Sequence, residues 1–408
     1  MGMLTALAWR NLWRQPRRTG LSLFSIAFTA ALLVFLLSFQ LGGYEQTKES
    51  ALELLDGYAQ IQPLGYADDP DIQRVLAAPA AVRAAIMRIP GVGAAALRIN
   101  TFAILANGRH SYGAIVFGVE PANEAMVSVV ANDTRAGRYL VSTDGAAAVI
   151  GDALARNLGA SVGTRITLLG SAIDGSVAAD VLPVVGIFHT GVPDLDRNLL
   201  EMPLARAQAT FALGDRVTTI ALSAPRLSDI QEALPDLRPI ADKHGMVLAD
   251  WAALEPSLRD TITLKYATSA LLYATLVVVV AFIILNTLLM SVLERTHEFG
   301  VLLAIGMKPS AIGRMIWLEL IAIAVLGSLI GIAVGGAASL WLEQVGIAFP
   351  AANDAFAQYG LPTRFFPQLS ALSALLGPGA IAAAICLGGI VPYLHVRRLE
   401  AVPAMRSA

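Results

Sequence analysis

Four long runs of uncharged, mostly apolar residues dominate the pattern along the chain. They are Gly20–Leu41, Tyr266–Leu293, Leu320–Leu342 and Leu369–Leu394. The first run has 22 residues. A helix of that length reaches about 33 Å, enough to cross a hydrocarbon core of about 30 Å. The pattern predicts four transmembrane helices, over 20–41, 266–293, 316–342 and 369–394.

The first run also has the arginine-rich flank of a secretory signal peptide. Its apolar length exceeds the roughly 7–15 residues of a signal-peptide core. The sequence therefore favours an uncleaved membrane anchor. The preceding segment, 1–19, places Trp9 and Trp13 among apolar residues and arginines. This pattern predicts an amphipathic N-terminal helix at the membrane surface.

A long polar segment, 42–265, separates the first two runs. Short β-rich stretches such as Arg165–Leu169 and Val181–Phe188 recur in it, and helical stretches such as Asp71–Ile89 and Asp152–Leu158 lie between them. The fold class predicted is a membrane protein with four transmembrane α-helices. A large α+β extracytoplasmic domain is inserted between helix 1 and helix 2.

The distribution of charge predicts the orientation in the membrane. The segments 1–19, 294–315 and 395–408 together hold ten basic and three acidic residues, whereas 42–265 holds 18 basic and 25 acidic residues. Lysine and arginine in short loops stay on the cytoplasmic side. Both termini and the 294–315 loop are therefore expected in the cytoplasm. The domain and the short 343–368 loop are expected outside the inner (cytoplasmic) membrane.

Motifs of known catalytic chemistry are missing from the sequence. It has no HExxH, no G-x-S-x-G and no Walker A motif, and its single cysteine, Cys386, lies in an apolar run. We expect no catalytic, cofactor-binding or metal-binding residue, and no nucleic-acid partner. His189 with Asp194 and Asp196 could form a metal site, but the turn-forming residues of 189–198 favour a turn.

Polar and small residues inside the spans suggest packing roles. Glu319 lies at the start of the third span, where we expect it to reach water or Arg314. Gly327, Gly331 and Gly335 recur every four residues and form a smooth helix face. That face could pack against another span of the same chain or against a second subunit, and the sequence does not separate the two.

The 294–316 segment is the most informative one. It begins with three charged residues, Glu294, Arg295 and Glu298, and apolar residues follow. The apolar pattern ends at Gly306, shortly before Pro309. A short apolar helix facing the cytoplasm needs a surface to bury against. The bilayer surface and a groove on a partner protein both fit the pattern.

The segment resembles the signature of FtsX-like permeases, the MacB-type class of ABC transporters. The residues that carry the resemblance are Glu294-Arg295-Thr296-x-Glu298-x-Gly300-x-Leu302-x-Ala304-Ile305-Gly306. The entry to the first span, Trp9-Arg10-Asn11-Leu12-Trp13-Arg14, and Val185-Gly186-Ile187-Phe188-x-Thr190-Gly191 in the outer domain are also similar to the family. In its length and in its lack of an attached ATPase domain, the sequence is most similar to lipoprotein-release-type permeases.

The resemblance implies a non-catalytic subunit that works by mechanotransmission. A separate cytoplasmic ATPase subunit would bind ATP and Mg and dock on the 294–306 segment. The coupling residues implied are Glu294, Arg295, Glu298, Gly300, Leu302, Ile305 and Gly306. A second permease copy or paralogue, membrane lipid, and a periplasmic or outer-membrane partner or lipoprotein are the other partners implied.

Three functions fit these observations. The first is a transporter subunit that extracts or exports a lipoprotein, lipid-linked or hydrophobic substrate. The second is a transmembrane signalling subunit that activates a periplasmic cell-wall hydrolase. The third is an ATP-independent receptor or scaffold. The sequence does not name the substrate or the direction of transport, nor does it separate a homodimer from a heterodimer.

Overall fold

A computed structural model describes residues 9–10, 13–14, 16–358, 361–390 and 393–394. The chain folds as two compact units. One contains Met1–Tyr44, Ile262–Ala348 and Arg364–Ala408, and the other contains Glu45–Thr261 and Phe349–Thr363. The predicted cytoplasmic tail, 395–408, and most of the predicted N-terminal helix lie outside the described residues.

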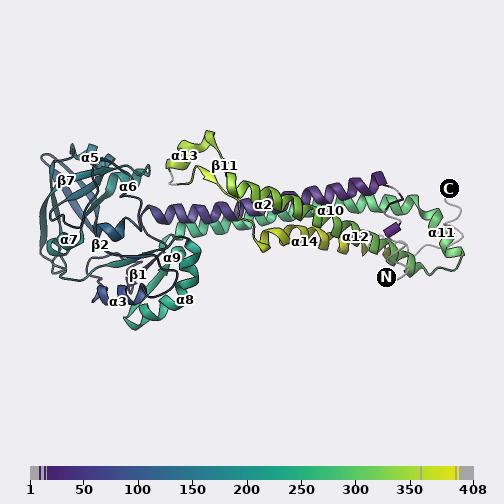
Figure 1. Ribbon diagram of the computed structural model, residues 1–408, viewed down its shortest axis with the longest axis horizontal. Helices are drawn as coiled ribbons and strands as arrows, with labels where there is room; N and C mark the ends of the chain where they lie inside the picture. Colours follow the sequence, from purple (N-terminus) through teal and green to yellow (C-terminus); the bar gives the residue numbers. More distant parts are fainter. Residues whose placement is uncertain (1–8, 11–12, 15, 359–360, 391–392, 395–408) are drawn as a thin grey trace. The chain divides into compact units, whose positions relative to one another are not determined.

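The first unit is a bundle of long apolar helices (Figure 1). Four helices of the described chain are long and apolar enough to cross a membrane. They are α2 (Pro16–Leu54), α10 (Pro256–Glu294), α12 (Pro309–Val345) and α14 (Ala371–Gly388). Three of them start at proline, whose fixed φ suits the first helical turn. A short helix, α11 (Thr296–Ala304), lies between α10 and α12.

Three of these helices, α2, α10 and α12, are much longer than the apolar runs that predicted them. Helices α2 and α10 each have 39 residues, which corresponds to about 58 Å at 1.5 Å per residue. Each is therefore much longer than a hydrocarbon core of about 30 Å. Residues 16–19, assigned from the sequence to the N-terminal segment, form the first turn of α2.

The glycine stripe of α12 packs against α2. A Cβ atom on Gly331 would lie 2.4 Å from the Ala30 Cβ, and one on Gly327 would lie 2.6 Å from Ile26. A Cβ atom on Gly335 would lie 2.5 Å from the Ala31 carbonyl oxygen. The two backbones approach this closely because these positions lack side chains. Within the described chain, then, α2 covers the stripe.

Replacing Gly331 by alanine is expected to destabilise the bundle. The new methyl group would overlap Ala30 and the Ala27 carbonyl oxygen, 2.8 Å away. Forcing an extra methyl group into a well-packed core typically costs about 1–3 kcal/mol. Thermal unfolding of the full chain in detergent should show a lower midpoint for Gly331→Ala. Gly336→Ala is the matched control, because its nearest new contact is Leu369 at 3.7 Å. Equal midpoints for the two variants would contradict this packing.

Side chains from all four long helices meet in the centre of the bundle. Ile26 and Leu33 of α2, Ile284 of α10, Leu320 of α12 and Ile385 of α14 are buried together. Hydrogen bonds join the helices as well. The Ser38 hydroxyl donates to the Ser373 hydroxyl at 3.0 Å, and the Trp317 indole donates to the Cys386 carbonyl at 3.2 Å.

The segment between α12 and α14 forms a small hairpin with two short helices. Its strands are antiparallel. The elements are β11 (Ile347–Ala348), η1 (Pro350–Ala352), α13 (Asn353–Gln358) and β12 (Arg364–Phe365).

The second unit is the α+β domain, and one of its lobes is a helix-covered antiparallel sheet. The strand order is β10-β1-β9-β2, with every neighbouring pair antiparallel. Apolar residues of α3 and α8, such as Val82, Ile86 and Ile230, are buried in its core. The elements are β1 (Ala59–Pro63), α3 (Pro79–Ile86), β2 (Ala94–Asn107), β9 (Thr219–Ser223), α8 (Leu227–Lys243), β10 (Met246–Asp250) and α9 (Trp251–Leu254).

The other lobe is a closed barrel. Strand β2 continues from the first sheet and pairs with both β3 and β6, and the ring closes in the order β2-β3-β8-β5-β7-β6. Strand β4 adds to β7 outside the ring. The elements are β3 (His110–Val119), α4 (Pro121–Glu124), β4 (Thr134–Gly137), β5 (Ala148–Gly151), α5 (Asp152–Leu158), β6 (Arg165–Ser171), β7 (Val177–Phe188), α6 (Pro193–Asn198), β8 (Leu199–Pro203) and α7 (Leu204–Thr210).

One helix expected in this domain is much shorter than its pattern suggested. The helix predicted over Asp71–Ile89 is confined to Pro79–Ile86. The Asp71 carboxylate accepts a hydrogen bond from the Gln73 amide at 3.0 Å, which forms an Asx turn. Leu76 then pairs with Val217 as an isolated strand bridge. The prediction was wrong over residues 71–78, where tertiary strand pairing overrides a weak helical pattern, and over residues 87–89, where the chain turns.

Charged groups are buried between the strands of this domain. Arg98 of β2 and Glu124 of α4 are fully buried, and the Arg98 Nε donates to Glu124 Oε2 at 2.9 Å. Glu201 of β8 is also fully buried, and the Tyr139 hydroxyl donates to its Oε2 at 2.6 Å. Burial, reinforced by the negative charge of Glu124, raises the pKa of Glu201 to about 8.

This shift predicts how stability depends on pH. A carboxyl group whose folded pKa is raised stabilises the fold fully below its unfolded pKa, near 4.5. The contribution is lost as pH rises through about 8, by up to about 1.4 kcal/mol per pH unit. Thermal midpoints of the full chain should therefore fall from pH 5 to pH 8 more steeply in the wild type than in Glu201→Gln. Parallel profiles for the two proteins would refute the raised pKa.

Candidate functional site

A cavity of about 500 Å³ lies between α2, α10 and α14. Its size falls within the range of small-molecule sites, and its wall is almost wholly apolar. The residues that line it include Leu33, Leu37 and Leu41 of α2, Ala270, Ala274, Val277 and Val278 of α10, and Leu372, Leu376 and Ala380 of α14.

A small polar group interrupts the apolar wall of this cavity. The Tyr273 hydroxyl donates to the Gln40 side-chain oxygen at 2.7 Å, and the Gln40 amide donates to the Tyr44 hydroxyl at 2.9 Å. The Tyr44 ring also meets the Tyr266 ring edge-to-face, with centroids 4.8 Å apart. Because these polar groups satisfy one another and the wall is otherwise apolar, the cavity is suited to the hydrocarbon chains of a ligand. The cavity is not visible in the sequence, because the residues that line it do not differ in type from the rest of the spans.

Helix α11 contains three of the seven residues predicted to couple to an ATPase, and the other four flank it at positions 294–295 and 305–306. Two of the predicted residues face inward: Gly300 is buried, and the Arg295 side chain is only 13% exposed. The Arg295 guanidinium contacts Glu319 at 3.5 Å and lies 5.3 Å from the ring centre of Phe299, which is itself buried. These contacts of Arg295 hold α11 against α12.

The outward face of α11 is partly apolar. Ile305 is 79% exposed and Val301 is 41% exposed. The Glu298 carboxylate, at the start of the helix, lies within ion-pair distance of Arg14 at 3.7 Å and of Arg295 at 3.3 Å. Val301 was not among the predicted coupling residues, although its position four residues before Ile305 places both on one helical face.

The remaining predicted residues have distinct positions. Glu294 is exposed at the end of α10. Leu302 is half-buried and packs against the Phe299 cluster. Gly306 follows α11 with a φ of +100°, which favours glycine and ends the helix.

The structure corrects one expected ion pair. Glu319 pairs with Arg295 and not with Arg314, whose Nε donates to the Ser310 carbonyl at 3.3 Å. Residues five apart on a helix are rotated by about 140°, so Arg314 and Glu319 of α12 face different directions. The pair instead joins α12 to the N-terminal end of α11.

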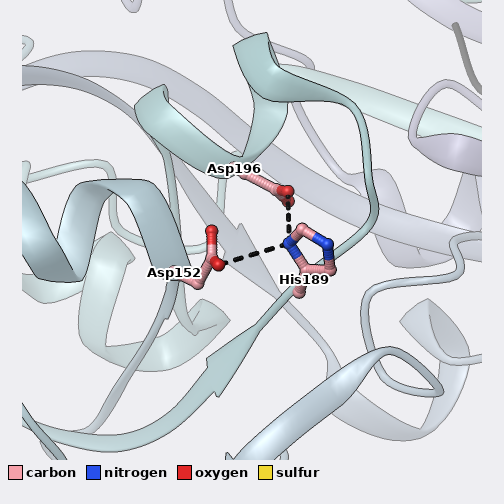
Figure 2. A group of neighbouring side chains, drawn as sticks. All are labelled: Asp152, His189 and Asp196. Carbon is pink, nitrogen blue, oxygen red and sulfur yellow. Dashed lines mark ion pairs between the residues drawn. The ribbon is translucent and has the colours of Figure 1, made fainter. Parts of the chain in front are cut away.

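The histidine weighed in the sequence as a metal ligand has different neighbours from those expected. His189 Nδ1 lies 2.9 Å from Asp196 Oδ2 and 3.3 Å from Asp152 Oδ2 (Figure 2). The expected partner Asp194 is not in this group. Residues two apart on a helix point in nearly opposite directions, so only one of Asp194 and Asp196 can face His189.

Comparisons with known proteins identify the family. The MacB-like periplasmic core domain matches residues 19–240, and the FtsX-like permease C-terminal domain matches residues 270–401. The chain belongs to the FtsX/MacB-type permease family. The two matched regions correspond to the inserted α+β domain with its first helix and to the three later spans.

The relatives of this permease carry two kinds of name. A lipoprotein-releasing system transmembrane protein LolC from Neisseria meningitidis is 27% identical over 256 residues, which cover 60% of each chain. A LolC from Xylella fastidiosa is 23% identical over 96% of each chain. A macrolide export ATP-binding/permease protein MacB 1/2 from Paracoccus denitrificans is 25% identical over 96% of this chain and 56% of that protein. The chain is thus an inner-membrane ABC transporter permease of the LolC/MacB type.

Proposed function

We propose that this permease moves a lipid-modified or similarly hydrophobic substrate, driven by a separate ATPase subunit. The apolar cavity between α2, α10 and α14 carries the proposal. It offers hydrocarbon contacts along three spans, and its two polar side chains, Gln40 and Tyr273, are hydrogen-bonded to each other. An acylated protein has the matching chemistry, with long chains attached through ester or amide carbonyls.

Helix α11 is proposed as the docking element for the ATPase subunit, with both termini of the chain on the cytoplasmic side. An exposed Ile305 beside Val301 suits insertion into an apolar groove. The inward contacts of Arg295 with Glu319 and Phe299 would hold the helix while force is applied to it. The ATPase subunit would bind ATP and Mg, because this chain has no nucleotide-binding motif.

Mechanotransmission is the proposed link between ATP hydrolysis and the outer domain. The end of α2 is tied into that domain at several points. The Glu49 carboxylate accepts a hydrogen bond from the Leu227 amide at 3.2 Å, and the Val129 amide donates to the Glu53 carbonyl at 3.0 Å. The Lys48 ammonium lies 4.9 Å from the ring centre of Trp251, five residues before α10 begins. A continuous helix fixed in this way transmits displacement along its axis.

Affinity purification from native membranes in mild detergent tests the proposal. We expect the tagged permease to elute with a stoichiometric ATPase subunit and with a second permease copy or paralogue. Co-elution of a cell-wall hydrolase in place of acylated protein would favour the signalling function. A folded permease that elutes without an ATPase would leave the ATP-independent receptor as the better description.

A further inference from the structure

We propose that Asp152, His189 and Asp196 form a binding site for a divalent transition-metal ion such as Zn²⁺, independent of the proposed transport function. The three side chains come from three elements of the barrel lobe and converge on one point (Figure 2). Asp152 starts α5, His189 follows β7, and Asp196 lies in α6.

The spacing of the ligand atoms fits an ion of this class. Zn²⁺ binds imidazole nitrogen and carboxylate oxygen at about 2.0–2.2 Å in tetrahedral geometry, which places neighbouring ligand atoms about 3.3 Å apart. The His189 Nδ1 lies 2.9 Å from Asp196 Oδ2 and 3.3 Å from Asp152 Oδ2. All three ligand atoms lie within 4.8 Å of one another. A mixed set of one nitrogen and two oxygens suits Zn²⁺ better than Mg²⁺ or Ca²⁺, which prefer oxygen alone.

The backbone around the site is built to hold these side chains together. A Cβ atom on Gly151 would lie 2.1 Å from the Asp196 carbonyl oxygen, so only glycine lets α5 start this close to α6. The His189 amide donates to the Asp133 carbonyl at 3.0 Å, which fixes the backbone of the histidine.

The Asp196 carboxylate is oriented by its own donors. Its Oδ1 accepts hydrogen bonds from the amide and the hydroxyl of Thr190, both at 2.8 Å, and its Oδ2 accepts one from the Gly191 amide at 3.2 Å. Outer hydrogen bonds of this kind orient metal-ligating carboxylates. The Asp196 side chain is only 4% exposed, whereas that of His189 is 50% exposed. The ion would therefore have protein on one side and water as its remaining ligand on the other.

The positively charged side chain of Arg156 would weaken binding of the ion. The Arg156 Nη1 donates to Asp152 Oδ2 at 2.6 Å, so the guanidinium and the ion compete for this oxygen. This competition supplies a variant that should gain affinity. Arg156→Ala removes a positive charge and frees the carboxylate, and its side chain is 68% exposed, so little packing is lost.

The experiment titrates metal-free full-length protein in detergent with Co²⁺, read by visible absorption, and with Zn²⁺, read by thermal unfolding. In the wild type we expect the visible absorption to saturate at one Co²⁺ per chain. We expect the midpoint of thermal unfolding to rise by about 5 °C at a hundredfold excess of Zn²⁺ over its Kd. His189→Gln and Asp152→Asn should lose both signals, and Arg156→Ala should bind at least threefold more tightly. His244→Gln is the matched control, because this exposed histidine of the same domain is not in the cluster.

Two results would overturn the proposal. The first is no absorption band and no change of midpoint in the wild type. The second is an unchanged response in His189→Gln, which would place the ion elsewhere on the protein. Reading the absorption band separately from the midpoint keeps the test valid even if a variant is less stable.

Discussion

Replacing Ile305 by aspartate is expected to abolish co-purification of the ATPase subunit while leaving the permease folded. Ile305 is 79% exposed, so the change removes almost no internal packing. An aspartate placed in an apolar groove would lose its water without gaining a partner. Truncation of a central interface residue typically costs about 2 kcal/mol or more, and a buried charge adds to that. We therefore expect at least a thirtyfold loss of affinity.

The measurement is the ratio of ATPase to permease after affinity purification in mild detergent. Val177→Asp is the matched control, because Val177 is also an apolar residue, 78% exposed, but lies in the α+β domain. Leu302→Asp is less informative, because Leu302 also packs inside the unit. An unchanged ratio for Ile305→Asp would remove α11 from the proposed docking surface.

Filling the apolar cavity is expected to give the second large effect. A tryptophan at Ala274 would occupy space between α10, α2 and α14 where we place the acyl chains. We expect photocrosslinking to fall at least tenfold, using a diacylated peptide whose photoactivatable group is at the end of an acyl chain. The physical reason is that a filled cavity leaves no apolar wall for the acyl chain to contact, so the chain gains no free energy by leaving water.

Leu272→Trp is the control for this experiment. Leu272 lies on the same helix, is 65% exposed and does not line the cavity. The same indole at that position should leave crosslinking unchanged. Undiminished labelling of Ala274→Trp, with the crosslinked residue mapped away from the cavity, would show that the substrate binds elsewhere. Either outcome of the crosslinking experiment leaves the proposed docking of the ATPase on α11 unaffected, because the two experiments probe separate surfaces.

The coupling segment could be located from the sequence, but the directions of its side chains could not. Its charged start, apolar middle and terminating Gly306 were visible as residue types, and the structure has a short helix there. Which residues face outward was not visible. Arg295 looks like a surface contact in the sequence but points inward to Glu319, 24 positions later in the chain. That pairing depends on how α11 packs against α12.

The outer domain gives a similar contrast. The helix over Asp152–Leu158 and the strand beginning at Arg165 were predicted from local patterns and are present as α5 and β6. The closed ring of strands was not predicted, because the paired residues of β2 and β6 are 61 to 67 positions apart in the chain. Local periodicity identifies a strand but carries no information about its distant neighbour.

The sequence by itself determined the number of apolar helices, the position of the inserted domain and the segment between α10 and α12. These features follow from hydrophobicity, charge and turn residues, which are local properties of the chain. Only the tertiary structure decided that α2 covers the glycine stripe, that three spans line a cavity, and that His189 meets Asp152 in place of Asp194. Each of these depends on which backbones approach closely, and close approach is settled by the packing of residues far apart in sequence.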